Sequence, residues 1–133
     1  MVSALQAFLI EASKELKKDV EVNLGGRLAE QKFIVRGLTL DEVQATRKKA
    51  IVADAAGKER QDDIEVTRQV IIAGCVEPDF RNAQFVKDAG CATPSQVIDK
   101  VLLAGEATRL AKEIMKASGL GEDINKAVEE AKN

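Results

Sequence analysis

Two cysteines are the residues whose type and spacing could do chemistry in this sequence. Cys75 and Cys91 each follow an Ala-Gly pair, in the stretches AGCVEPDF and AGCATP, and these stretches also hold the only two prolines. A pair of thiolates can act as nucleophiles, bind a metal ion or form a disulfide. Each of these roles requires particular partners elsewhere in the chain.

The chain lacks most of those partners. It contains no histidine, which removes the commonest general base, the commonest metal ligand and every Cys-His or Ser-His nucleophile pair. A structural zinc ion needs four ligands, and two cysteines sixteen positions apart provide only two. A disulfide between Cys75 and Cys91 is geometrically possible, but nothing in the sequence supports one. We therefore expect no metal site and reduced thiols.

Other catalytic patterns are absent as well. The stretch NLGGRL, residues 23–28, has neither the glycine spacing nor the following helix pattern of a phosphate-binding loop. Acid–base catalysis by Asp and Glu stays formally open because the chain contains 22 of these residues. We expect no enzymatic activity and no cofactor.

The two cysteine stretches are better explained as helix ends. Gly74 lies where the end of a helix needs a residue that tolerates a positive φ angle. Pro78 prevents that helix from resuming and biases Glu77 toward an extended conformation. The cysteines are then small apolar residues packed at helix ends.

Composition favours one soluble domain over residues 1–133. Hydrophobic residues make up 45% and charged residues 32%, with a net charge of −2. Nucleic-acid binding is not expected, because the basic residues are scattered and Trp and Tyr are absent. No apolar run approaches the ~20 residues of a membrane span, and the start lacks the basic region of a signal peptide. We expect a cytoplasmic protein.

The N-terminal third is predicted to form a helix and a hairpin. Ser3 and Gln6 form a capping box at the start of the first helix, and its apolar stripe consists of Leu5, Phe8, Leu9, Ala12 and Leu16. Apolar residues then alternate at Val20, Val22 and Leu24, and KFIVRGL is a second β-prone run. We expect a two-stranded hairpin at about residues 20–37, with a helix covering one face.

The clearest local signal is the capping box of Thr39 and Glu42, with Leu38 and Val43 as its hydrophobic staple. This second helix is expected to run to about Ala55. Residues 57–63 then form a solvated connection or a frayed helix start, and a third helix runs from Ile64 to near Gly74.

The C-terminal half is predicted to be helical throughout. A short helix capped by Asp79 or Asn82 should end at Gly90, and Thr93 with Gln96 restarts the chain as a helix with proline at its first position. Gly105 either breaks or weakens the helix that follows. Glycines 119 and 121 end that segment, and a last, peripheral helix covers about residues 122–132. The inward-facing residues are expected to be Phe85, Val86, Val97, Ile98, Val101, Leu102, Leu110, Ile114 and Met115. The expected fold class is mainly α with a small β-hairpin near the N-terminus (α+β), with five to six helices after the hairpin.

Several ordered segments resemble one known family. GCVEPDF, then TPSQVIDKVLLAGE and EDINKAVEEAKN, are similar to the XkdN-like family of phage tail assembly chaperones, and KFIVRGLTLDEVQATRKK resembles that family's strand and capped helix. The resemblance covers roughly residues 5–133 and implies a non-enzymatic role in building the tail of a phage or prophage. It also implies that the protein binds the tape measure protein, helps to recruit tail tube subunits, works in the host bacterial cytoplasm and is absent from the finished virion. A homo-oligomer is a further candidate assembly.

Two alternatives belong to other functional classes: a small helical adaptor or regulatory module that binds another bacterial protein, and a nucleic-acid-binding regulator. For a tape measure client, the candidate contact residues are Ile124 and Val128 on the last helix, because that helix buries little by itself. The same two residues could instead pack on the domain's own core.

The C-terminal residues are compatible with a second, longer product. Many tail assembly chaperones are made in two lengths by ribosomal slippage, and the resemblance raises that expectation here. A slippery heptamer A-AAA-AAC would be read within Ala131-Lys132-Asn133. The alternative is an ordinary helix end, where Lys132 complements the helix dipole.

Overall fold

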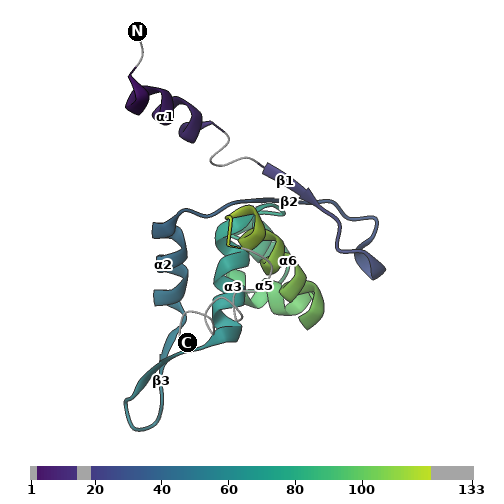
Figure 1. The fold of residues 1–133 in the computed structure, drawn as a ribbon. Helices are drawn as coiled ribbons and strands as arrows, with labels where there is room; N and C mark the ends of the chain where they lie inside the picture. The colour runs from purple at the N-terminus through teal and green to yellow at the C-terminus, as the bar shows by residue number, and fades with distance from the viewer. Residues whose placement is uncertain (1–2, 15–18, 121–133) are drawn as a thin grey trace.

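The computed structural model describes residues 3–14 and 19–120 of the 133-residue chain. Figure 1 shows its elements, which follow the order α1 (Ala4–Ser13), β1 (Asp19–Val22), the 3₁₀ turn η1 (Gly26–Leu28), β2 (Phe33–Arg36), α2 (Leu40–Lys49), β3 (Ile51–Ala53), β4 (Glu59–Gln61), α3 (Asp63–Gly74), β5 (Cys75–Glu77), α4 (Ala83–Asp88), α5 (Pro94–Val101) and α6 (Ala104–Ala117). The expected fold class, mainly α with a small β component, is confirmed.

The predicted hairpin is present, but it is part of a three-stranded sheet. β1 and β2 pair antiparallel, with Val20 opposite Val35, and β5 pairs antiparallel with the other edge of β2. The hairpin is confirmed, and β5 is a third strand that was not predicted. The third strand forms because Pro78 keeps Glu77 extended, and an extended segment beside β2 satisfies its backbone groups by joining the sheet.

The second helix is shorter than predicted. α2 ends at Lys49 instead of near Ala55, and β3 and β4 form a second antiparallel hairpin where the end of that helix and a solvated connection were expected. Ile51 and Val52 are β-branched and favour extended backbone. Asp54 closes the turn, because its Oδ1 accepts hydrogen bonds at 2.9 Å from the backbone N–H groups of both Ala56 and Lys58.

The helix starts are where the sequence predicted them. All three predicted capping boxes are formed, by the pairs Ser3–Gln6, Thr39–Glu42 and Thr93–Gln96. Asn82 caps α4, since its Oδ1 accepts from the N–H of Phe85 at 2.9 Å. Leu38 and Val43, the expected staple, are both buried.

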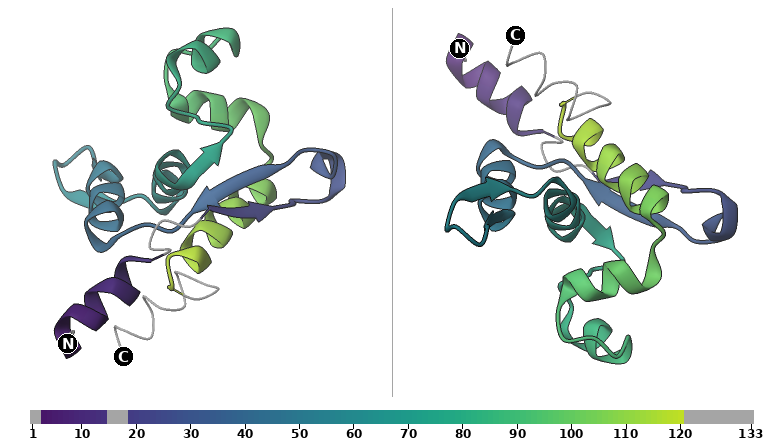
Figure 2. Two further views of the ribbon diagram at one scale, coloured as in Figure 1. Left: turned by 90° about the horizontal axis from the view of Figure 1, so that it is seen from above. Right: turned by 90° about the horizontal axis from the view of Figure 1, so that it is seen from below.

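Helix α6 covers one side of the β1–β2 hairpin and packs along α3, as the two views in Figure 2 show. A single cluster of buried apolar residues joins these elements to α2, α4 and α5. Leu110, Ile114 and Met115 lie in it as predicted, each at most 2% exposed. The single-domain organisation of residues 1–133 stays a prediction.

Gly74 has a different role from the predicted one. It is the last residue of α3, it is buried, and its φ angle is not positive. A Cβ atom at this position would overlap Cγ2 of Ile114 on α6. The absence of a side chain therefore allows α3 and α6 to approach each other closely. Gly90 and Gly119, in contrast, have positive φ angles of 73° and 79° just after α4 and α6.

The break between α5 and α6 lies before Gly105, which is inside α6. Leu102 and Leu103 are extended, and Oε1 of Glu106 accepts a hydrogen bond from the N–H of Leu103 at 2.8 Å. This contact caps α6 and makes Leu103 its starting point. Val101 was expected inside but is 36% exposed, because the break directs the last residue of α5 outward.

A second close approach joins the two halves of the chain. A Cβ atom on Gly37 would lie 2.5 Å from the carbonyl oxygen of Ala117, so only glycine fits between β2 and the end of α6. Next to it, the N–H of Leu38 donates to Oγ of Ser118 at 2.7 Å. The start of α2 is thereby fixed to the end of α6.

The two glycines on α3 and α6 predict opposite effects of the same substitution. Gly74→Ala should lower the free energy of unfolding by about 1–3 kcal/mol, because the added methyl group overpacks the contact with Ile114. Gly105→Ala should raise it by about 0.5 kcal/mol, because nothing lies near its Cβ position and alanine is the better helix former. Urea unfolding of both variants measures these two changes in the free energy of unfolding. Equal changes would contradict the assigned packing.

The ion pair between Arg36 and Glu42 predicts a loss of stability in acid. Its two contacts measure 3.0 Å and 2.5 Å, and the hydrogen bond from Arg36 is the main reason that the pKa of Glu42 is lowered from 4.5 to about 2. A lowered pKa in the folded state stabilises the protein above pH 4.5, and this contribution is lost as the pH falls from 4.5 toward 2.

The variant Glu42→Gln isolates this contribution, because glutamine keeps the capping box and removes the charge. At pH 7 it should be less stable than the parent by about 1–2 kcal/mol. Denaturant unfolding from pH 7 to pH 2 should show the two proteins converging in acid. A constant difference over that range would show that the ion pair does not cause it.

Candidate protein-interaction surfaces

The cysteines are placed as the sequence indicated. Cys75 caps α3, begins β5 and is 1% exposed, and Cys91 is half-buried after α4; both are free thiols. Burial raises the pKa of Cys75 to about 12, so its thiol is neutral near pH 7 and lacks the thiolate that nucleophilic chemistry needs. Both residues serve packing.

Glu106 is a buried carboxylate and therefore needs an explanation. It is 3% exposed, and its Oε1 accepts hydrogen bonds from the N–H of Leu103 and, at 2.7 Å, from Nη2 of Arg27. These two contacts lower the pKa of Glu106. Arg27 also donates to the carbonyl of Val101 at 2.6 Å. The carboxylate thus links η1 to the junction of α5 and α6 through hydrogen bonds.

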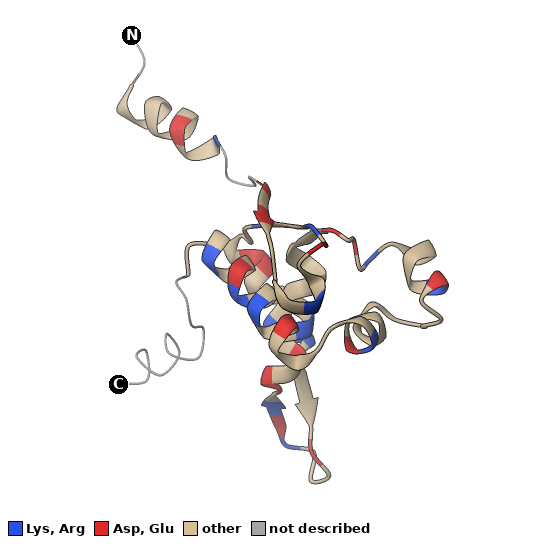
Figure 3. Ribbon diagram, turned by 90° about the vertical axis from the view of Figure 1, so that its right-hand side faces the viewer, with Lys and Arg blue, Asp and Glu red and all other residues tan. Residues whose placement is uncertain are grey.

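Within residues 3–14 and 19–120, no three His, Cys, Asp or Glu side chains lie together as metal ligands would. None of the helices described there is long and apolar enough to span a membrane. In the view of Figure 3, lysines and arginines are interspersed with acidic residues along the described helices. The notable features of the surface are apolar.

The first of these is helix α1, whose apolar side chains no other described element covers. None of its residues is buried, and Leu5, Phe8, Leu9 and Ile10 are 68%, 64%, 54% and 54% exposed. Figures 1 and 3 show the helix set apart from the other elements and almost free of charged residues. Exposed apolar side chains gathered on one short element mark an interaction surface.

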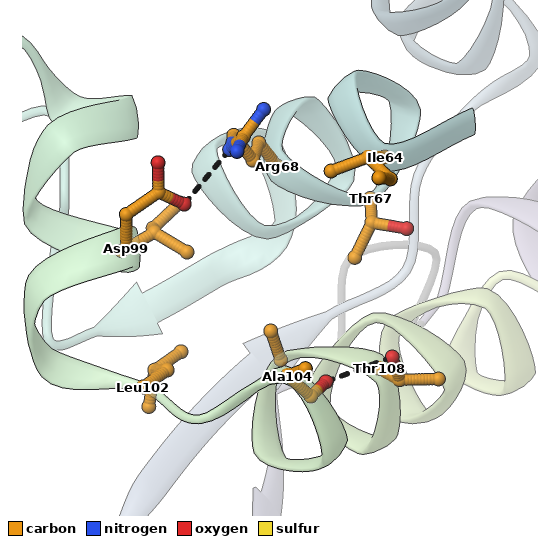
Figure 4. A pocket seen from close by; sticks show the side chains of 9 residues that line it. Ile64, Thr67, Arg68, Asp99, Leu102, Ala104 and Thr108 are labelled. Atoms are coloured by element: carbon orange, nitrogen blue, oxygen red, sulfur yellow. Dashed lines mark hydrogen bonds and ion pairs between the residues drawn. The ribbon is translucent and has the colours of Figure 1, made fainter. Parts of the chain in front are cut away.

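The second feature is a groove of about 340 Å³ among α3, α5 and α6. Figure 4 shows side chains of α3 on one side and those of α6 on the other, with the α5 end between them. Its lining residues are Ile64, Thr67, Arg68, Ile98, Asp99, Leu102, Ala104, Ala107 and Thr108. The groove is mostly apolar, with one ion pair at its edge.

The predicted client residues, Ile124 and Val128, lie outside the described residues, as do the last predicted helix and the Ala131–Asn133 segment.

Sequence reasoning found the stripe of α1 but missed that it is uncovered. One signal was present: Ile10 lies on the opposite side from Leu5, Phe8 and Leu9, so the helix is apolar on more than one face.

Comparisons with known proteins support one family. A sequence model described as "Phage XkdN-like tail assembly chaperone protein, TAC" matches residues 5–132. The crystal structure of the protein YqbN has a similar fold, with a TM-score of 0.67 and 17% sequence identity, over 86% of this chain and 96% of that one. At this identity the likeness shows the fold alone. No curated protein matches the chain.

Proposed function

Because the chain belongs to the XkdN-like family of phage tail assembly chaperones, we propose that it binds the tape measure protein and helps to recruit tail tube subunits during tail assembly. In this proposal the protein is not an enzyme. It acts in the cytoplasm of the host bacterium and leaves before the virion is complete.

The observation that carries the proposal is the uncovered helix α1. Leu5, Phe8 and Leu9 lie at positions i, i+3 and i+4, the spacing with which one amphipathic helix packs against another. Their exposure means that they do not stabilise the chain's own fold. A tape measure segment with a long amphipathic helical pattern is a client that could cover them.

The expected strength of this contact suits a chaperone. Full burial of a large apolar side chain stabilises by about 1.5–3 kcal/mol, and the three large side chains on one side of α1, Leu5, Phe8 and Leu9, are 68%, 64% and 54% exposed. Covering them contributes on the order of 3–5 kcal/mol, from which the cost of association is subtracted. Such a contact is reversible, and a chaperone that leaves its client requires reversibility.

The double variant Leu5→Ser with Phe8→Ser tests the proposal. It should bind purified tape measure segments at least about tenfold more weakly than the parent. At a low protein concentration, of about 1 μM, where self-association contributes little, its melting temperature should stay within about 2 °C of the parent's, because α1 adds nothing to the core. Isothermal titration calorimetry and thermal melts provide the two readings.

Leu40→Ser is the matched control, since Leu40 is a leucine on α2 that is 85% exposed. It removes an even more exposed apolar side chain from another helix and should leave binding unchanged. If the α1 variant binds as tightly as the parent, α1 is not the client surface. A comparable loss in both variants would indicate nonspecific adhesion.

Ile124 and Val128 belong to the same proposal as a second client contact. Changing both to Ser distinguishes the two interpretations of this stripe. Weaker binding with an unchanged, cooperative melt supports the client role. A large fall in melting temperature supports packing on the domain's own core.

A longer product would supply the recruitment of tube subunits. In this part of the proposal, slippage within the codons of Ala131-Lys132-Asn133 fuses an extension that binds the tube protein. Two products should then be made from the native operon. A gene without the heptamer A-AAA-AAC, without an overlapping −1 frame, or with a single product on immunoblots would contradict it.

A further inference from the structure

The groove among α3, α5 and α6 has room for large apolar side chains. Its volume of about 340 Å³ is more than twice the ~150 Å³ of a protein cavity that binds benzene. Ile98 and Leu102 are buried in its floor, and Ile64 stands at its edge, 66% exposed. A phenyl ring together with a leucine side chain fits this space.

The ionic groups of the groove are already paired. Nε of Arg68 donates to Oδ1 of Asp99 at 2.8 Å, and its Nη1 donates to Oε2 of Glu65 at 2.9 Å. The two acidic partners neutralise the guanidinium, which therefore does not call for an anionic ligand. The chemistry of the groove favours an apolar occupant.

The walls of the groove favour a helix in particular. Thr67 on α3 faces Ala104 and Thr108 on α6 (Figure 4), and all three side chains are small. Small residues on facing walls allow the backbone of another helix to approach, while its larger side chains fill the space between them. The occupant should therefore present large apolar residues one helical turn apart.

We infer that the groove receives helix α1 of a second copy of this chain, in a reciprocal exchange that forms a symmetric dimer. α1 has the required pattern, with Leu5, Phe8 and Leu9 along one side, and it is uncovered. Within residues 3–14 and 19–120, the structure thus has an apolar helix without a groove and an apolar groove without a helix. Such complementary surfaces on one chain form a closed, two-fold assembly when two copies exchange them.

The area available requires that the exchange be reciprocal. Leu5, Phe8 and Leu9, which share one side of α1, each expose roughly 100 Å², so one helix in one groove removes on the order of 600 Å² of total surface from water, counting both partners. Stable interfaces bury about 1,200–2,000 Å². Two symmetric contacts reach about 1,200 Å², the lower end of the range for a stable dimer.

The exchange would also regulate client binding, and this consequence alone rests on the proposed function. In the free protein α1 is held in the partner's groove, where its apolar side chains are protected from aggregation. A client helix can bind α1 only after α1 has left the partner's groove. Client binding and dimerisation then compete for the same helix.

Sedimentation of the purified full chain, with two single variants, tests the inference. Phe8→Ser removes the largest anchor from α1, and Thr108→Arg places a long charged side chain in the groove from an exposed position. The parent should sediment as a dimer at about 100 μM, and each variant should be at least tenfold weaker in dimerisation. Leu40→Ser should dimerise like the parent.

Mixing the two variants distinguishes this exchange from any other dimer. A mixed pair has one intact contact, between α1 of the Thr108→Arg chain and the groove of the Phe8→Ser chain. The mixture should therefore dimerise more strongly than either variant alone. A monomeric parent, including one with α1 folded onto its own groove, would overturn the inference. So would a dimer that neither substitution weakens, or a mixture that gains nothing.

Client binding by Thr108→Arg separates this inference from the proposed function. In this variant α1 has its native sequence and is not held in a partner's groove. The variant should therefore bind tape measure segments at least as tightly as the parent. If both substitutions disrupt the dimer but no variant and no parent protein binds tape measure segments, the proposed function alone is contradicted. Client binding through α1 by a parent that is monomeric would contradict the exchange alone.

Discussion

The contact between Gly74 and Ile114 sets the distance between α3 and α6, and much of the structure depends on that distance. There is no space for a side chain on Gly74, so the two helices lie close and bury Val70, Ile71 and Leu110 between the sheet and the other helices. Strand β5 begins at the next residue, which brings it beside β2. Further along the same pair of helices, small residues leave the groove open. The absence of a side chain on Gly74 thus allows the close helix contact beside which β5 joins the sheet.

The features that could be predicted from the sequence are those set by neighbouring residues. The capping boxes at Ser3, Thr39 and Thr93 are formed because each joins groups three positions apart. Strand β5 could not be predicted in this way, because its partner in β2 lies about forty positions earlier. The position of Gly74 at a helix end was recognised, but its role depends on Ile114, which also lies about forty positions away. Local patterns identify where elements begin and end, whereas contacts between distant segments decide what they pack against.

The candidate surfaces illustrate the same limit. Periodicity identifies an apolar stripe on α1, but it does not tell whether another element covers it. The groove combines three helices whose lining residues are spread from Ile64 to Thr108, and no single stretch of sequence contains its pattern. From the sequence alone, Glu106 would be taken for an ordinary surface carboxylate. Its burial depends on its contact with Arg27 in η1, which no local pattern indicates. Fold class follows from composition and local signals, and the surfaces follow only from the packed structure.

The junction of Gly37 and Leu38 with Ala117 and Ser118 affects how the chain folds as it is made. It joins residues about eighty positions apart, and synthesis delivers the N-terminal side first. Until α6 has left the ribosome, the apolar face of β1 and β2, with Val22 and Val35, has no helix to cover it. Contacts of such long sequence separation also slow folding. A nascent chain halted before α6 therefore displays an open apolar sheet, the kind of surface that aggregates or is held by ribosome-associated factors.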